Sequence, residues 1–99
     1  MKKITLLCAL GVSTGMLVTK MKKAAQELHF DAEIAAYSVD EFDTVAQDSD
    51  MILLGPQVSY MVKGLKAKKP DLPIEAIDML AYGMMDGKKV VMRCMDVLG

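Results

Sequence analysis

The fold that this sequence predicts follows from one stretch near its start, Ile4-Thr5-Leu6-Leu7-Cys8-Ala9-Leu10-Gly11-Val12-Ser13-Thr14-Gly15-Met16-Leu17. Residues 4–7 form an apolar run that is long enough for one buried strand and too short for a helix. Gly11 and Gly15 interrupt this run, and beyond them the apolar residues return at helical spacing. The stretch therefore predicts a strand, a tight loop and a helix, with Cys8 at the point where the strand ends.

At this position the Cys8 thiol would lie beside the N-terminus of a helix, which favours anions. The first turn of a helix has unpaired backbone N–H groups and the positive end of the helix dipole, which together bind anions. A thiolate and a phosphoryl group are both anions, so the loop offers a lowered thiol pKa and donors for an oxyanion. Ser13 or Thr14 fits the N-cap of the helix and supplies a hydroxyl. The alternative is that Cys8 is a small buried apolar residue at the end of a strand.

The rest of the chain alternates between strand and helix patterns. Lys66, Lys68 and Lys69 suit the negative end of the third helix, and Pro70 stops it. Proline at the start of the last strand suits an edge position. The segment 78–83 is expected to be a connection. The expected strands are 4–7, 32–37, 50–55 and 72–77, and the expected helices are 13–29, a short acidic helix around 40–46, 58–69 and 84–98.

This βαβαβαβα order predicts an α/β fold with a four-stranded parallel sheet and helices on both faces. The expected strand order is 2-1-3-4, the flavodoxin-like winding, whose switch point lies between strands 1 and 3. Ligands bind such sheets beside the switch point, at the carboxyl ends of the strands. Cys8 follows strand 1, and Gly55, Pro56 and Gln57 follow strand 3. The topology therefore directs attention to the loop that contains Cys8.

Composition narrows the class of protein. The 99 residues, 53% of them hydrophobic, fit a single domain over residues 1–99. The net charge is −1 and the sequence has no basic stripe, so nucleic-acid binding is not expected. No apolar run reaches the length of a membrane span and no signal peptide is evident, so a soluble cytoplasmic protein is expected. Because His29 is the single histidine, the sequence offers no set of histidine ligands for a metal. Cys94 is expected to be a packing residue whose thiol forms no disulfide.

Two segments resemble a known family. The pattern Cys8-x-x-Gly11-x-Ser13-Thr14-x-x-Leu17, directly after a first strand, is similar to the phosphocysteine loop of enzyme IIB proteins. These are the IIB proteins of the lactose/cellobiose/chitobiose branch of the phosphoenolpyruvate-dependent sugar phosphotransferase system. The resemblance extends to Tyr82-Gly83-Met84-Met85-Asp86-Gly87 and covers essentially the whole chain.

The resemblance implies a phosphocarrier that needs no metal or cofactor. Cys8 would accept a phosphoryl group from the phosphohistidine of a IIA protein and pass it to a sugar held by the membrane protein IIC. Within this branch the sugar is a β-linked disaccharide such as cellobiose, chitobiose or lactose. Backbone N–H groups along the loop would hold the phosphoryl oxygens. The residues expected in this cradle are Ala9, Leu10, Gly11, Val12, Ser13, Thr14 and Gly15.

Apolar residues near the loop suggest where partners dock. We expect Leu10 and Val12, with Tyr82, Met84 and Met85, to form an exposed apolar surface for IIA and IIC, because such a patch around a reactive atom marks a transient interface. The alternative is that these side chains close the core from above. A monomer is expected, because each transfer needs Cys8 to be open to a partner.

Two other functions remain possible at this point. A cysteine phosphatase of the low-molecular-weight type also places its nucleophile after strand 1. It requires an arginine six residues later and an acid, usually in an Asp-Pro pair. Thr14 occupies the arginine position here, and the sequence contains no Asp-Pro. The second alternative is a non-catalytic binding or regulatory module on the same scaffold, because a fold alone does not determine function.

Overall fold

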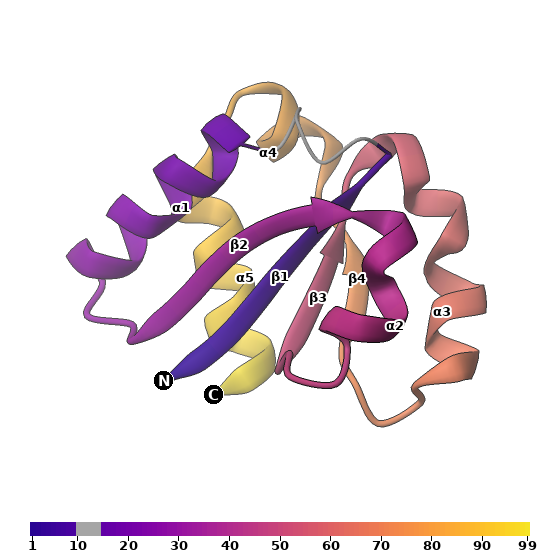
Figure 1. The fold of residues 1–99 in the computed structure, drawn as a ribbon. Helices are drawn as coiled ribbons and strands as arrows, with labels where there is room; N and C mark the ends of the chain where they lie inside the picture. Colours follow the sequence, from indigo (N-terminus) through magenta and orange to yellow (C-terminus); the bar gives the residue numbers. More distant parts are fainter. Residues whose placement is uncertain (10–14) are drawn as a thin grey trace.

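The computed structural model describes residues 1–9 and 15–99, and the sheet has the predicted winding. The four strands are parallel and lie in the order β2-β1-β3-β4 (Figure 1). β1 and β3 occupy the centre, and every residue from Ile4 to Cys8 and from Met51 to Leu54 is buried. Such unbroken burial is typical of parallel strands that are covered on both faces. The strands are β1 (Lys2–Cys8), β2 (Ala32–Ser38), β3 (Met51–Leu54) and β4 (Ile74–Ala76).

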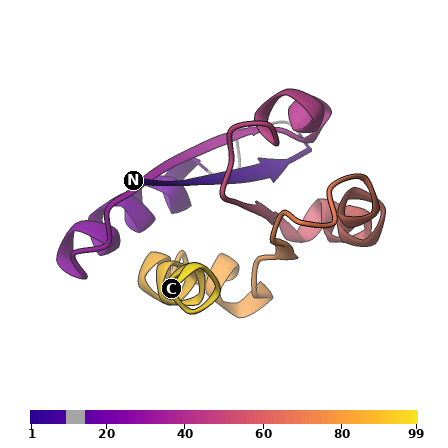
Figure 2. The same ribbon diagram turned by 90° about the horizontal axis from the view of Figure 1, so that it is seen from below.

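Helices cover both faces of the sheet (Figures 1 and 2). One apolar core lies between the sheet and the pair α1 and α5, and a second core lies under α2, η2 and α3. The α-helices are α1 (Gly15–Glu27), α2 (Phe42–Val45), α3 (Val62–Lys68), α4 (Met79–Gly83) and α5 (Gly87–Leu98), and the 3₁₀ helices are η1 (Val39–Glu41) and η2 (Pro56–Met61).

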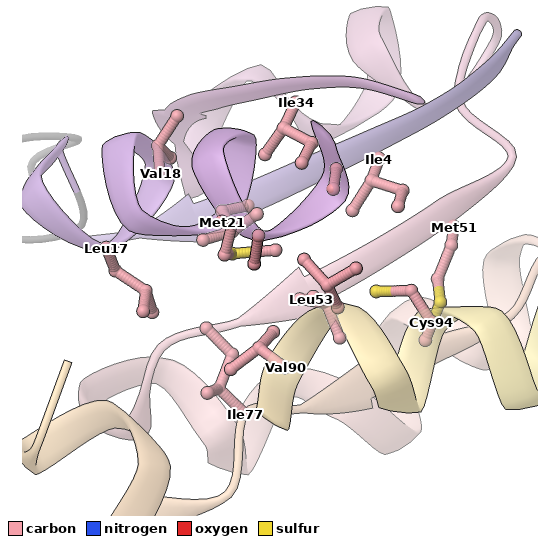
Figure 3. Close-up of a cluster of buried hydrophobic side chains, with 14 of the residues drawn as sticks. Ile4, Leu17, Val18, Met21, Ile34, Met51, Leu53, Ile77, Val90 and Cys94 are labelled. Atoms are coloured by element: carbon pink, nitrogen blue, oxygen red, sulfur yellow. The ribbon is translucent and has the colours of Figure 1, made fainter. Parts of the chain in front are cut away.

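Side chains from the sheet, α1 and α5 meet in the first core (Figure 3). Neighbouring residues of β1 face opposite cores: Leu6 belongs to the first and Leu7 to the second. Cys94 of α5 lies in the first core and is fully buried. Its burial raises the pKa of the thiol to about 12. The expectation that Cys94 is a packing residue is confirmed by this environment.

Two close contacts join elements that are distant in the sequence. The Thr5 side chain is buried, and its hydroxyl lies 2.6 Å from that of Ser49, which donates to the Val45 carbonyl at 2.7 Å. Gly87 lies directly against α1, where a Cβ would be 2.5 Å from the Lys20 carbonyl carbon. A glycine at this position therefore allows the start of α5 to contact the backbone of α1.

The predicted elements differ from the observed ones mainly at their ends. The segment 78–83, expected to be a connection, contains the short helix α4. The last helix begins at Gly87 rather than at residue 84, because the Asp86 side chain accepts from the Lys89 N–H and caps it there. α1 begins at Gly15, whereas its predicted start, Ser13, lies outside the described residues.

The segment predicted as one helix over 58–69 consists of the end of η2 followed by α3. η2 itself is kinked at Val58, which departs from helical backbone geometry (φ −121°, ψ 15°). Across residues 1–9 and 15–99, no helix is both long enough and apolar enough to cross a bilayer.

Candidate functional site

Cys8 lies at the predicted switch point of the sheet. It is the last residue of β1 and pairs in register with Ser38, the last residue of β2. On the other side, the Gly55 N–H donates to the Leu7 carbonyl at 2.9 Å. A Cβ on Gly55 would lie 3.6 Å from the Cys8 Cβ. The loop after β3 is therefore next to Cys8, as the topology predicted.

The Cys8 side chain is only 1% exposed, whereas the following residue, Ala9, is exposed. This differs from the expected accessible thiol. β1 is paired with β2 as far as Cys8 and with β3 as far as Leu7. The Ser38 hydroxyl donates to the Ala9 carbonyl at 3.4 Å, which links the residue after Cys8 to the end of β2.

The predicted oxyanion cradle is described only at its two ends. Ala9 follows β1 directly, and Gly15 is the first residue of α1. Leu10, Gly11, Val12, Ser13 and Thr14 lie outside the described residues.

The first turn of α1 contains no acidic residue, so no carboxylate on it neutralises the positive end of the helix dipole. A helix N-terminus of this kind favours a bound anion.

The candidate docking residues fall into two groups. Met84 is 70% exposed, whereas Tyr82 and Met85 are half-buried and pack against the first core. Met85 has a left-handed backbone (φ 53°) at the end of α4, and the Asp86 N–H donates to the Ala81 carbonyl at 2.8 Å across this turn. Leu10 and Val12, the other two candidates, belong to the segment that the structure does not describe. For Tyr82 and Met85 the alternative of closing the core is therefore the better description.

Two further exposed apolar residues near Met84 were not predicted from the sequence. Met79 is 76% exposed and Leu80 is 65% exposed, both on α4. The sequence signal for this helix is Asp78, a suitable N-cap residue. Its side chain accepts from the Ala81 N–H at 2.9 Å and caps α4. This hydrogen bond is the main reason that the pKa of Asp78 is lowered. A helix of five residues is too short to show the apolar period by which helices are recognised.

The positions of two other side chains bear on the phosphatase alternative. Arg93, the one arginine of the sequence, donates to both carboxylate oxygens of Glu75, at 2.7 and 3.0 Å. These two residues border a hollow of about 300 Å³ between β4 and α5, whose lining does not include Cys8. The single histidine, His29, lies beyond the far end of α1, a helix of 13 residues and about 20 Å. Cys8 therefore has neither this arginine nor this histidine beside it.

Within residues 1–9 and 15–99, no three histidine, cysteine or acidic side chains come together as a possible ligand set.

The sequence matches a family described as "PTS system, Lactose/Cellobiose specific IIB subunit" over residues 3–93. The chain belongs to this family. IIB components are phosphotransferases of the phosphoenolpyruvate-dependent sugar phosphotransferase system, and they work with IIA and IIC partners. The resemblance predicted from the Cys8 loop and the 82–87 segment is thereby confirmed at the level of the family.

Curated relatives agree with this assignment. The "PTS system oligo-beta-mannoside-specific EIIB component" of Bacillus subtilis (strain 168) is 42% identical over 100 residues, which cover 99% of this chain and 97% of that protein. The "PTS system galactose-specific EIIB component" of Lactococcus lactis subsp. cremoris (strain MG1363) is 47% identical over 98 residues, with 91% and 90% covered.

Solved structures share the fold. The solution structure of a cellobiose-specific IIB component from Borrelia burgdorferi aligns with a TM-score of 0.74 and 36% identity, covering 92% of this chain and 85% of that one. The lactose-specific IIB domain from Streptococcus pneumoniae aligns with a TM-score of 0.81 over 96% and 95% of the two chains. Its identity of 19% makes it a comparison of fold alone.

Proposed function

We propose that this IIB protein carries a phosphoryl group on Cys8. In the first step, the Cys8 thiolate attacks the phosphorus of a IIA phosphohistidine, so the P–N bond breaks as the S–P bond forms. In the second step, a hydroxyl of the sugar in IIC attacks the same phosphorus. The S–P bond breaks, the hydroxyl loses its proton and the thiolate returns. The observation that carries this proposal is the position of Cys8 at the switch point, next to Gly55.

Backbone N–H groups are the proposed holders of the phosphoryl oxygens. The cradle would run from Ala9 to Gly15, with the Ser13 and Thr14 hydroxyls as additional donors. Its support is the start of α1 at Gly15, because an uncompensated helix N-terminus favours an anion. The same field would favour the thiolate form of Cys8 before transfer.

A carrier is a better explanation than a phosphatase. A phosphatase must bind the equatorial oxygens with an arginine and protonate a poor leaving group. Arg93 is instead held by Glu75 beside β4. A phosphohistidine donor needs less from the chain, because its imidazole leaves readily and the partner helps to position it.

The proposed acceptor is a β-linked saccharide bound by IIC. The relatives are named for oligo-β-mannoside, galactose and cellobiose although they share 42–47% identity with this chain. This range of names is expected if the sugar pocket belongs to IIC. We further propose that the chain acts in the cytoplasm as a monomeric single domain, because Cys8 must meet IIA and IIC in turn.

The test is phosphorylation of sugar by the complete relay. Membranes with IIC from a β-glucoside system are supplied with phosphoenolpyruvate, the general phosphotransferase proteins, IIA and this protein. We expect sugar phosphate with the wild type and with Cys94→Ser, and none with Cys8→Ser. Equal activity of the Cys8→Ser variant would overturn the proposal. If no product forms with any IIC of the branch, the carrier function fails for these sugars.

A further inference from the structure

We infer that exposed apolar side chains on α4 form the docking surface for the phosphohistidine-bearing IIA protein. These side chains are Met79, Leu80 and Met84, here called the α4 patch, and they are 76%, 65% and 70% exposed. Met79 and Leu80 lie on the helix, and Met84 directly follows it. The inference rests on the proposed function, because it names the surface through which the phosphoryl donor reaches Cys8.

The α4 patch lies at the same edge of the sheet as Cys8. The Gly55 N–H bonds to the Leu7 carbonyl, and the Ile77 N–H bonds to the Leu54 carbonyl, both at 2.9 Å. The ends of β1, β3 and β4 are therefore joined in a row, and α4 begins two residues after Ile77. Figure 1 shows α4 at the upper edge, toward which the strand arrows point. A donor that reaches Cys8 must approach this edge.

The helix is anchored on its inner side and bare on its outer side. Ala81 is buried and Tyr82 packs against the first core, which fixes the orientation of α4. The Asp78 cap holds its first turn. With the inner side occupied in this way, the three large apolar side chains of the α4 patch remain in water. Covering them removes apolar surface from water, which favours association.

The chemistry of the α4 patch selects a protein with an apolar surface. Residues 79–85 contain no charged side chain, and the flanking charge of Asp78 is paired with Lys89 at 3.6 Å. Anionic lipid or nucleic acid would require basic residues here. A second copy of the chain on this edge would block Cys8. Methionine side chains adapt to different partners, and a small patch suits the weak contact of a shuttling protein.

The experiment measures the rate of phosphoryl transfer from phosphorylated IIA as a function of IIA concentration. Leu80→Asp and Leu80→Lys both remove the apolar contact but add opposite charges, so a change of charge alone would move the rate in opposite directions. Met92→Asp is the matched control, because Met92 is 50% exposed on α5, more than a helical turn beyond the start of that helix. Circular dichroism and urea midpoints verify that each variant is folded.

Both Leu80 variants should raise the half-saturating IIA concentration about tenfold and leave the maximal rate unchanged, as expected for the loss of a central interface side chain. Met92→Asp should stay within about twofold of the wild type, in the range of a residue outside the interface. Wild-type kinetics in both Leu80 variants would overturn the inference. So would a fall in the maximal rate alone, or a defect confined to transfer onward to IIC. If wild-type Cys8 accepts no phosphoryl group, the proposed function fails as well; normal wild-type transfer with unaffected Leu80 variants refutes the docking surface alone.

Discussion

Replacing Gly87 with alanine should destabilise the protein, because the added Cβ would overlap the backbone of α1. The Cβ would lie 2.5 Å from the Lys20 carbonyl carbon, 2.6 Å from the Met21 nitrogen and 2.8 Å from the Lys20 Cβ. Carbon atoms in contact normally lie about 3.5–4.0 Å apart. Because two of these three atoms are backbone, α1 and α5 must move apart by about 1 Å.

The size of the effect follows from two opposing contributions. Overpacking a tightly packed site costs about 1–3 kcal/mol. Replacing glycine by alanine in a helix returns less than about 1 kcal/mol, and less still at the first residue of α5. The net loss should be about 1–2 kcal/mol, out of roughly 5–15 kcal/mol for a domain of this length. The variant therefore folds, with a lower free energy of unfolding.

Urea denaturation followed by circular dichroism measures this loss. With a slope of about 1–2 kcal/mol per molar urea, the midpoint should fall by about 1 M. Gly64→Ala is the matched control, because Gly64 lies in α3 and nothing is within 4 Å of the added Cβ. The control should be neutral or more stable by about 0.5–1 kcal/mol. A Gly87→Ala variant as stable as the wild type, or an equal loss in the control, would refute the reasoning.

Three further variants test other parts of the account. Ser49→Ala should lower the free energy of unfolding by about 1–3 kcal/mol, because it leaves the buried Thr5 hydroxyl without its acceptor; an unchanged urea midpoint would contradict this. The Cys94 thiol has a pKa of about 12 in the folded protein and of 9.0 in the unfolded chain. The free energy of unfolding should therefore be unaffected by this thiol below pH 9 and should fall by about 1.4 kcal/mol per pH unit above it, because only the unfolded chain then loses the proton. Comparison with Cys94→Ala up to pH 11 measures this, since the variant should lack that part of the slope. Gly55→Val should slow transfer from IIA to Cys8 about tenfold or more, because it places a branched side chain beside the thiol, and wild-type kinetics would show that the space is not needed.

The sequence predicted the sheet well because its central strands carry strong local signals. Residues 51–54 are apolar without alternation, residues 4–7 are apolar apart from Thr5, and both segments are buried throughout. Alternation of strand and helix then restricts the winding, and the observed order β2-β1-β3-β4 is the predicted one. The neighbourhood of Cys8 and Gly55 follows from that order, because parallel strands bring their carboxyl ends to one edge.

The exposed and buried sides of the α4 region were harder to predict. The segment 78–83 is too short for a helical period, so α4 and the exposure of Met79 and Leu80 did not emerge from the pattern. Burial of Tyr82 and Met85 depends on where the turn after α4 sits on the first core, which is a tertiary contact. The burial of Cys8 is likewise a tertiary feature that the local sequence pattern does not predict.

Phosphorylation of Cys8 is tested by the intact mass of the protein after incubation with phosphoenolpyruvate, the general phosphotransferase proteins and a IIA of this branch. Wild type, Cys8→Ser and Cys94→Ser are compared under the same conditions. We expect wild type and Cys94→Ser to gain one phosphoryl group and Cys8→Ser to gain none. A phosphoryl group that persists in Cys8→Ser, or that is lost only in Cys94→Ser, would contradict it.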